Sequence, residues 1–207
     1  RIMGRAIGPN GNAGGRQQRQ IVATYPYHDE QGQVLFEVVR FEPKDFRQRR
    51  PDGKGGWAWN LNGVHLAPYR LPRLLRSKWA FIVEGEKDAD ALARWNLVAT
   101  CNPGGAGKWR PEYSERLRGR RVTVIPDSDA PGRKHAAEVA ESLLGVGVEV
   151  RILELPTAKD ASDWVEAGGT REGLLGLARA AQPLTAATLA EWRAKWEPKQ
   201  KPESSKA

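Results

Sequence analysis

The stretch Ala80-Phe81-Ile82-Val83-Glu84-Gly85-Glu86-Lys87-Asp88-Ala89-Asp90 decides the fold. It opens with a short apolar run, which is typical of a strand buried on both faces of a parallel sheet. A second apolar run, Val122-Thr123-Val124-Ile125, comes shortly before Asp127 and Asp129. Because open α/β sheets place their sites at the carboxyl ends of strands, we expect the two acidic groups to meet at one edge of the sheet.

The pattern from residue 80 onward alternates strands with helices. We expect strands over 80–83, 97–100, 121–125 and 148–153, and helices over 87–94, 131–144, 170–181 and 185–196. This alternation favours right-handed βαβ units and a mostly parallel sheet flanked by helices. The predicted α/β domain covers residues 78–183, and a C-terminal helix with a disordered tail covers 184–207.

A different composition precedes this domain. Residues 1–19 are rich in Gly, Arg, Gln and Asn, which predicts a flexible N-terminal segment. Two strands are expected over 21–27 and 34–41, on either side of a turn at Asp29-Glu30-Gln31-Gly32. We therefore assign residues 20–77 to a small, basic, antiparallel β module that ends in a short helix over 71–76.

The net charge of +8 lies entirely in the first part of the chain. Residues 1–79 carry fourteen Lys or Arg against six Asp or Glu, and the remaining residues carry nineteen of each kind. A basic segment beside an acidic centre suits a polyanionic partner. The alternative is a solvated basic surface that aids solubility.

Cysteine content and hydropathy restrict the class of protein. Cys101 is the only cysteine, which excludes a disulfide within the chain and a Cys₄ or Cys₂His₂ zinc site. No apolar run approaches the roughly 20 residues of a membrane span, and no secretory pattern opens the sequence. We therefore expect a cytoplasmic protein that has no membrane partner.

Clustered carboxylates predict a metal site. Glu84, Asp127 and Asp129 would repel one another, and a hard dication such as Mg²⁺ or Mn²⁺ would relieve that repulsion. The alternative is that these residues only cap the helices that follow them. Asp88 lies one turn after Glu84 on the same helix face, either to help order a metal or as a surface carboxylate.

Three motifs together resemble a known family. Glu84-Gly85 with Asp88, Asp127-x-Asp129 with Gly132, and Lys159-Asp160-Ala161-Ser162-Asp163-Trp164 look like the TOPRIM domain of bacterial-type primases, topoisomerases, some nucleases and RecR proteins. The primase members carry two acids in the third motif with one residue between them, whereas two residues separate Asp160 from Asp163. Asp160 is the better candidate ligand. The pieces Phe41-Glu42-Pro43-Lys44, Phe46-Arg47-Gln48-Arg49 and Tyr69-Arg70-Leu71-Pro72 are similar to the segment that precedes TOPRIM in phage and mobile-element primases.

The resemblance implies the catalytic core of a DNA primase. Such an enzyme makes short primers on a single-stranded DNA template from nucleoside triphosphates, using Mg²⁺ or Mn²⁺. Asp127 and Asp129 would hold metal, Glu84 would hold metal or accept the proton of the primer 3′-hydroxyl, and Asp88 and Asp160 are further candidate ligands. A replicative helicase is an additional implied partner. A small TOPRIM nuclease and a nucleic-acid-binding fragment without turnover are the alternatives.

Two further groups of residues suit a nucleic acid. Basic residues that could contact phosphates surround two tryptophans that could stack on bases. The basic residues are Arg47, Arg49, Arg50 and Lys54, and the tryptophans are Trp57 and Trp59. The alternative places both tryptophans in the core of the β module. Gly104, Gly105 and Lys108 follow a predicted strand, where free backbone N–H groups favour phosphate contact, or they form a simple turn.

Overall fold

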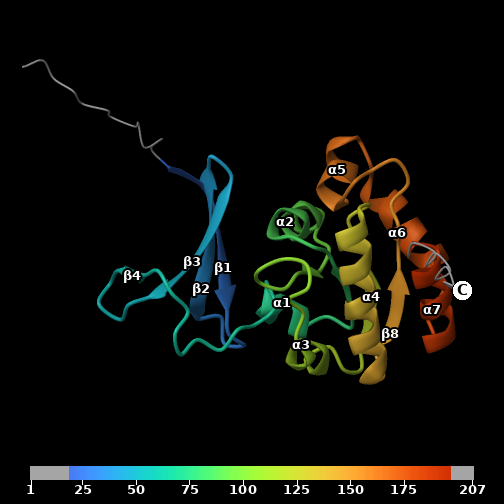
Figure 1. Cartoon of the computed structure of the whole chain (residues 1–207), viewed down its shortest axis with the longest axis horizontal. Coiled ribbons are helices and arrows are strands. Elements are labelled where there is room, and N and C mark those ends of the chain that lie inside the picture. Colours follow the sequence, from blue (N-terminus) through green and yellow to red (C-terminus); the bar gives the residue numbers. More distant parts are fainter. Residues whose placement is uncertain (1–18, 197–207) are drawn as a thin grey trace, which may run out of the picture.

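Two four-stranded sheets organise the protein (Figure 1). The computed structural model describes residues 19–196, so nearly all of the predicted flexible segment 1–19, and the predicted tail beyond residue 196, lie outside the described residues. The first sheet is antiparallel, in the order β1 (Gln20–His28), β2 (Val34–Glu42), β3 (Asp45–Pro51), β4 (Trp57–Ala58). The second is parallel, in the order β6 (Ala99–Thr100), β5 (Trp79–Ile82), β7 (Arg121–Val124), β8 (Glu149–Ile152).

The helices surround the parallel sheet, whereas the antiparallel sheet lies to one side of it (Figure 1). They are α1 (Leu71–Leu75), α2 (Glu86–Arg94), α3 (Pro111–Glu115), α4 (Ala130–Gly145), α5 (Ala161–Glu166), α6 (Arg171–Ala180) and α7 (Ala186–Ala194). The predicted α/β fold with a preceding β module is confirmed, and the second sheet is parallel throughout. Within residues 19–196, no helix is both long and apolar enough to cross a bilayer.

Two local predictions were inaccurate. The strand expected over 97–100 is reduced to β6, because Asn96 takes a left-handed backbone (φ 61°) and pairing with β5 begins only at Ala99. Helix α3 was not predicted, since five residues are too few to show a helical period. Neither difference changes where β5 and β7 end, which is what positions Glu84 and Asp127.

The order of the parallel strands creates a crevice. The chain runs from β5 outward to β6, and then returns past β5 to β7, so consecutive connections leave in opposite directions. Ligands of open α/β sheets bind outside the carboxyl ends of the strands at such a switch point. Glu84 follows β5 and Asp127 follows β7, which places the two residues on either side of the crevice.

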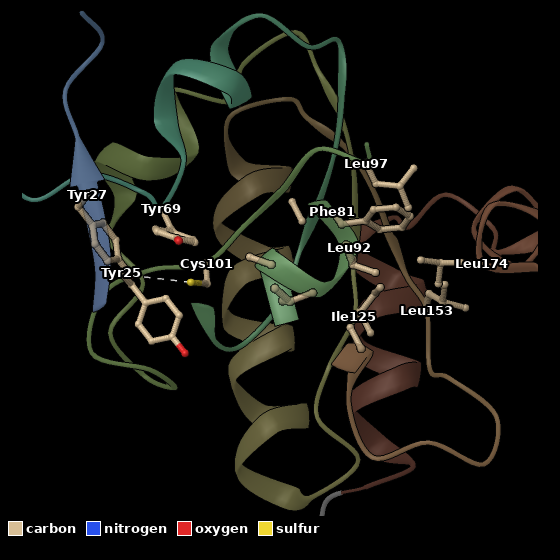
Figure 2. Packing of buried hydrophobic residues seen from close by; sticks show 14 of the residues in the cluster. Tyr25, Tyr27, Tyr69, Phe81, Leu92, Leu97, Cys101, Ile125, Leu153 and Leu174 are labelled. Carbon is tan, nitrogen blue, oxygen red and sulfur yellow. Dashed lines mark hydrogen bonds between the residues drawn. The ribbon is translucent and has the colours of Figure 1, made fainter. Parts of the chain in front are cut away.

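Both faces of the parallel sheet are buried, as its unbroken apolar strands require. One core contains Phe81, Leu92, Leu97, Leu153 and Leu174 (Figure 2). The other lies under α4 and contains Leu74 of α1, Ile82, Val122, Val150 and Leu189 of α7. Helices α1 and α7 therefore pack in the same core as the parallel sheet.

Tyrosines fix the antiparallel sheet against α2. The Tyr27 hydroxyl donates a hydrogen bond to Glu86 Oε1 (2.8 Å) and lies 3.8 Å from Cys101 Sγ, the contact dashed in Figure 2. Tyr69 stands beside Tyr27, with 5.1 Å between ring centroids, and its hydroxyl donates to Asp90 Oδ1 (3.1 Å). Tyr27 is fully buried. Its contacts therefore fix the antiparallel sheet relative to the parallel sheet.

Candidate nucleotidyl-transfer site

A cleft of about 580 Å³ lies between the antiparallel sheet and the carboxyl end of the parallel sheet. Its acidic wall comes from the start of α2 and from the turns that follow β5, β6 and β7, and comprises Glu84, Gly85, Glu86, Asp88, Gly104, Gly105 and Asp127. Its other wall comes from β2, β3 and the turn between them, and comprises Val38, Lys44, Phe46 and Gln48. The cleft thus brings together five of the predicted site residues: Glu84, Asp88, Asp127, Gly104 and Gly105.

Glu84 occupies the turn between β5 and α2. Its Oε2 atom is buried and accepts no hydrogen bond from any described residue. Burial, followed by the negative charges of Asp129 and Asp88, raises the pKa of Glu84. A buried carboxylate oxygen without a partner is costly, so this atom is available for a proton or a cation.

Asp127 follows β7 at the same edge. Burial raises its pKa to about 7, and the charges of Glu84, Asp88 and Asp160 add to the effect while Lys159 opposes it. Gly132, in the first turn of α4, approaches this residue closely. A Cβ atom there would lie 2.7 Å from Asp127 Cβ and 2.7 Å from its carbonyl oxygen, so only glycine lets α4 begin so near. The requirement for glycine at position 132, after the Asp-x-Asp motif, is therefore steric.

Asp129 is the N-cap of α4. Its Oδ1 atom accepts a hydrogen bond from the backbone N–H of Gly132 (2.8 Å), as capping residues do. Helix capping, the alternative role considered for Asp129, therefore occupies one of its two carboxylate oxygens. Its charge still helps to raise the pKa of Glu84, so the side chain belongs to the same electrostatic cluster.

Asp88 and Asp160 lie where α2 meets the start of α5. Asp88 is only 7% exposed, so it is not a surface carboxylate, and its Oδ1 accepts from the backbone N–H of Ser162 (2.9 Å). Burial raises its pKa to about 6. Asp160 caps α5 and accepts hydrogen bonds from the Asp163 N–H (2.8 Å) and the Ser162 hydroxyl (2.8 Å). Burial raises the pKa of Asp160, but these hydrogen bonds outweigh it and hold the pKa below the usual range.

The carboxylates suit a hard dication chemically. Among residues 19–196, no three Asp, Glu, His or Cys side chains form a ready metal cluster in the present side-chain arrangement. The donor set nevertheless fits: Glu84 offers an unpartnered buried oxygen, and its charge helps to raise the pKa of Asp127. Oxygen-only donors of this kind are the ligands of Mg²⁺ and Mn²⁺.

The glycine loop after β6 lines the cleft and is also an ordered turn. Gly104 (φ 86°) and Gly105 (φ 73°) take left-handed conformations that favour glycine. The Asn102 side-chain amide donates to the Gly105 carbonyl (2.7 Å), and the Gly107 N–H donates to His135 Nδ1 (3.1 Å). Lys108 is exposed at the end of this loop and does not line the cleft.

The basic and aromatic group occupies the other face of the antiparallel sheet. Side chains alternate along β3, so Arg47 and Arg49 point away from the face that carries Phe46 and Gln48. Arg49 pairs with Glu37 (2.7 Å) and lies over the rings of Trp57 (4.2 Å) and Trp59 (5.4 Å). With 38% and 50% of their surfaces exposed, the two tryptophans are surface residues.

The remaining basic residues lie near this outer group. The Arg50 guanidinium donates to Asn60 Oδ1 (3.3 Å), and Lys54 belongs to the turn that Asp52 closes. Sequence reasoning missed Lys44, Phe46 and Gln48, which face the carboxylates. The alternation of β3 was the available signal, because it separates Phe46 and Gln48 from Arg47 and Arg49.

Comparison with known proteins decides the family. Residues 81–165 match the Toprim-like family model, which spans all three acidic motifs. The Gene 57 protein of Mycobacterium phage D29 is 34% identical over 124 residues, which cover 59% of this chain and 78% of the phage protein. This chain belongs to the Toprim-like family.

Solved primases share the Toprim-like fold and the module in front of it. A DNA primase domain from Pseudomonas aeruginosa superposes with a TM-score of 0.63 at 26% identity, covering 83% of this chain and 53% of that one. A DnaG primase catalytic domain bound to single-stranded DNA superposes with a TM-score of 0.61 at 21% identity, covering 83% and 55%. The chain therefore spans about half the length of these primase structures.

Proposed function

We propose that this Toprim-like chain is the catalytic core of a DNA primase, which synthesises short primers on single-stranded DNA by metal-dependent nucleotidyl transfer. The observation that carries the proposal is the pair Glu84 and Asp127. These carboxylates flank the switch point of the parallel sheet and open into a cleft whose far wall is built by the β module. The likeness to primase cores extends over both sheets, which favours a primase over other members of the family.

We assign the metal to the carboxylate edge. Asp127 and the free oxygen of Asp129 would hold Mg²⁺ or Mn²⁺, with Glu84 either as a further ligand or as the base that accepts the 3′-hydroxyl proton. Asp88 and Asp160 also have one oxygen each occupied by a hydrogen bond, and they would be further ligands through the other oxygen or through water. When bound, the metal supplies charge neutralisation for the attacking and leaving oxygens of phosphoryl transfer.

The other residues of the cleft would position the substrates. The backbone of Gly104 and Gly105 can approach a triphosphate closely, because neither residue carries a side chain. Lys108 at the end of the loop would contact an outer phosphate as a flexible point charge. These contacts would hold a nucleoside triphosphate beside Glu84 and Asp127, and positioning of this kind is a large part of phosphoryl-transfer catalysis.

The outer face of the β module would retain the template strand beyond the cleft. Arg47 and Lys54 supply positive charge there, and Trp57 and Trp59 offer exposed rings to unpaired bases. Arg50 adds charge at the end of β3, from the strand face that carries Phe46 and Gln48. Arg49 is committed to Glu37 and to both rings, so it would hold the tryptophans in place. A replicative helicase is the partner that would supply the single strand.

One assay tests the proposal against both alternatives. The protein is incubated with end-labelled single-stranded DNA, all nucleoside triphosphates and Mg²⁺ or Mn²⁺, and the products are separated by size. New short RNA, dependent on template and metal, is the expected result. Shortened template would instead indicate a nuclease, and retention of DNA without either product would indicate a binding fragment.

A further inference from the structure

An aromatic side chain faces the carboxylates across the cleft. Phe46, on β3, is 48% exposed, whereas the other two phenylalanines of this sheet, Phe36 and Phe41, are buried. It lines the same cleft as Glu84 and Asp127, and Gln48 stands next to it on the same strand face. The guanidinium carbon of Arg40, which pairs with Phe46 across the sheet, lies 6.0 Å from the ring centroid.

The two walls of the cleft differ in charge. The wall made by α2 and the end of the parallel sheet carries Glu84, Glu86, Asp88 and Asp127. On the opposite side Val38, Phe46 and Gln48 are uncharged, and Lys44 is the one charged residue that lines the cleft. Phosphates are repelled by uncompensated carboxylates and gain nothing from a phenyl ring. A nucleobase is uncharged, stacks on aromatic rings and exchanges hydrogen bonds with amides, so Phe46 and Gln48 suit a base.

We propose that Phe46 and Gln48 form a base-binding wall. An unpaired base of the single-stranded template stacks on the Phe46 ring, and the Gln48 side-chain amide forms hydrogen bonds with the edge of that base. The inference rests on the proposed function, because it takes the occupant of the cleft to be a nucleic acid strand. It assigns Phe46 and Gln48 a role in positioning the template, distinct from the outer group of Arg47, Trp57 and Trp59. Lys44, at the same wall, lies where the backbone of that strand would pass.

Paired oligonucleotides with and without bases test the wall directly. Binding of a labelled short oligothymidylate and of an abasic oligomer of equal length is measured with Mg²⁺ and without nucleoside triphosphates. Phe46→Ala should weaken binding of the oligothymidylate about tenfold, since stacking on one aromatic contributes roughly 1–3 kcal/mol per base. Binding of the abasic oligomer should change less than about twofold, because it has no base to stack.

Three variants complete the design. Phe46→Trp should restore the preference for the oligothymidylate, and Gln48→Ala should reduce it several-fold. Trp196→Ala is the matched control, because Trp196 is 43% exposed and lies under Arg133 (3.9 Å), away from the cleft. An equal loss for both oligomers, or no loss in Phe46→Ala, would overturn the inference. The assay involves no synthesis, so a wild-type protein that makes no primer would defeat the proposed function without deciding this point.

Discussion

The two sheets place their functional side chains by different rules. In the parallel sheet, Glu84 and Asp127 lie in turns after β5 and β7, and the strand order alone brings those turns together. In the antiparallel sheet, residues that are neighbours in sequence fall on opposite faces, so Phe46 faces the cleft and Arg47 does not. Strand order therefore joins residues that are distant in sequence into one site in the first sheet, whereas residues adjacent in sequence lie on opposite faces of the second.

The largest expected effect separates chemistry from strand binding. Asp127→Asn keeps the shape of the side chain and removes its charge, so turnover should fall about a thousandfold, equivalent to about 4 kcal/mol of transition-state stabilisation. The affinity for single-stranded DNA should change less than about twofold, because the basic residues of the β module are untouched. Primer yield and fluorescence anisotropy measure the two quantities.

The control for this variant is Glu166→Gln, which removes one carboxylate charge from α5 at an exposed surface pair with Lys87 (2.9 Å). It should retain nearly full turnover. If Asp127→Asn retains turnover as well, Asp127 has no part in the chemistry.

Two glycine substitutions test how the carboxylate edge is built. Gly132→Ala places a methyl group 2.7 Å from backbone and side-chain atoms of Asp127, so it should destabilise the fold by about 1–3 kcal/mol and reduce turnover. Gly176→Ala in α6 meets no atom within 4 Å and should stabilise the fold by about 0.5–1 kcal/mol. Urea unfolding measures both; equal effects would show that α4 does not pack tightly on Asp127.

The metal-free protein should lose stability as pH rises. Folding raises the pKa of Asp127 from near 4 to about 7, so the folded state binds more protons between these values and its free energy of unfolding falls across that window. In Asp127→Asn, this fall in the free energy of unfolding should be smaller by roughly 1–2 kcal/mol. Solvent screens the half-buried side chain, so the effect is smaller than the full pKa shift would give. Urea unfolding with a chelator at several pH values measures the slope; an unchanged slope in the variant would contradict the raised pKa.

The smallest expected effects lie in the β module and distinguish its arginines. Arg47→Ala removes an exposed surface pair with Asp45, so stability should change by less than about 0.5 kcal/mol while the salt dependence of DNA binding falls by about one ion. Arg49→Ala breaks the contacts with Glu37, Trp57 and Trp59 and should cost about 1–2 kcal/mol of stability. If the two variants behave alike in both measurements, the outer group does not divide into binding and supporting arginines.

The sequence predicted the parallel sheet better than the antiparallel one for a physical reason. Apolar runs fix β5 and β7, and the carboxyl end of a parallel strand is determined once the strand is known, so the positions of Glu84 and Asp127 followed. Strands β1 and β2 were also predicted, but β3 was not assigned, and which face of β3 meets the cleft depends on packing between Tyr27 and Glu86, which are 59 residues apart. The hydrogen bond from the Ser162 N–H to Asp88 joins residues that are 74 apart, and no local pattern predicts it.

Titration of metal into the protein is the most direct test of the carboxylate edge. Mn²⁺ binding, followed by electron paramagnetic resonance of the free ion, should show a site in the wild-type protein and in Glu166→Gln. The double variant Glu84→Gln, Asp127→Asn should lose that site while keeping its fold by circular dichroism. Absence of a site in the wild-type protein, or unchanged binding in the double variant, would contradict the assignment of a dication to these carboxylates.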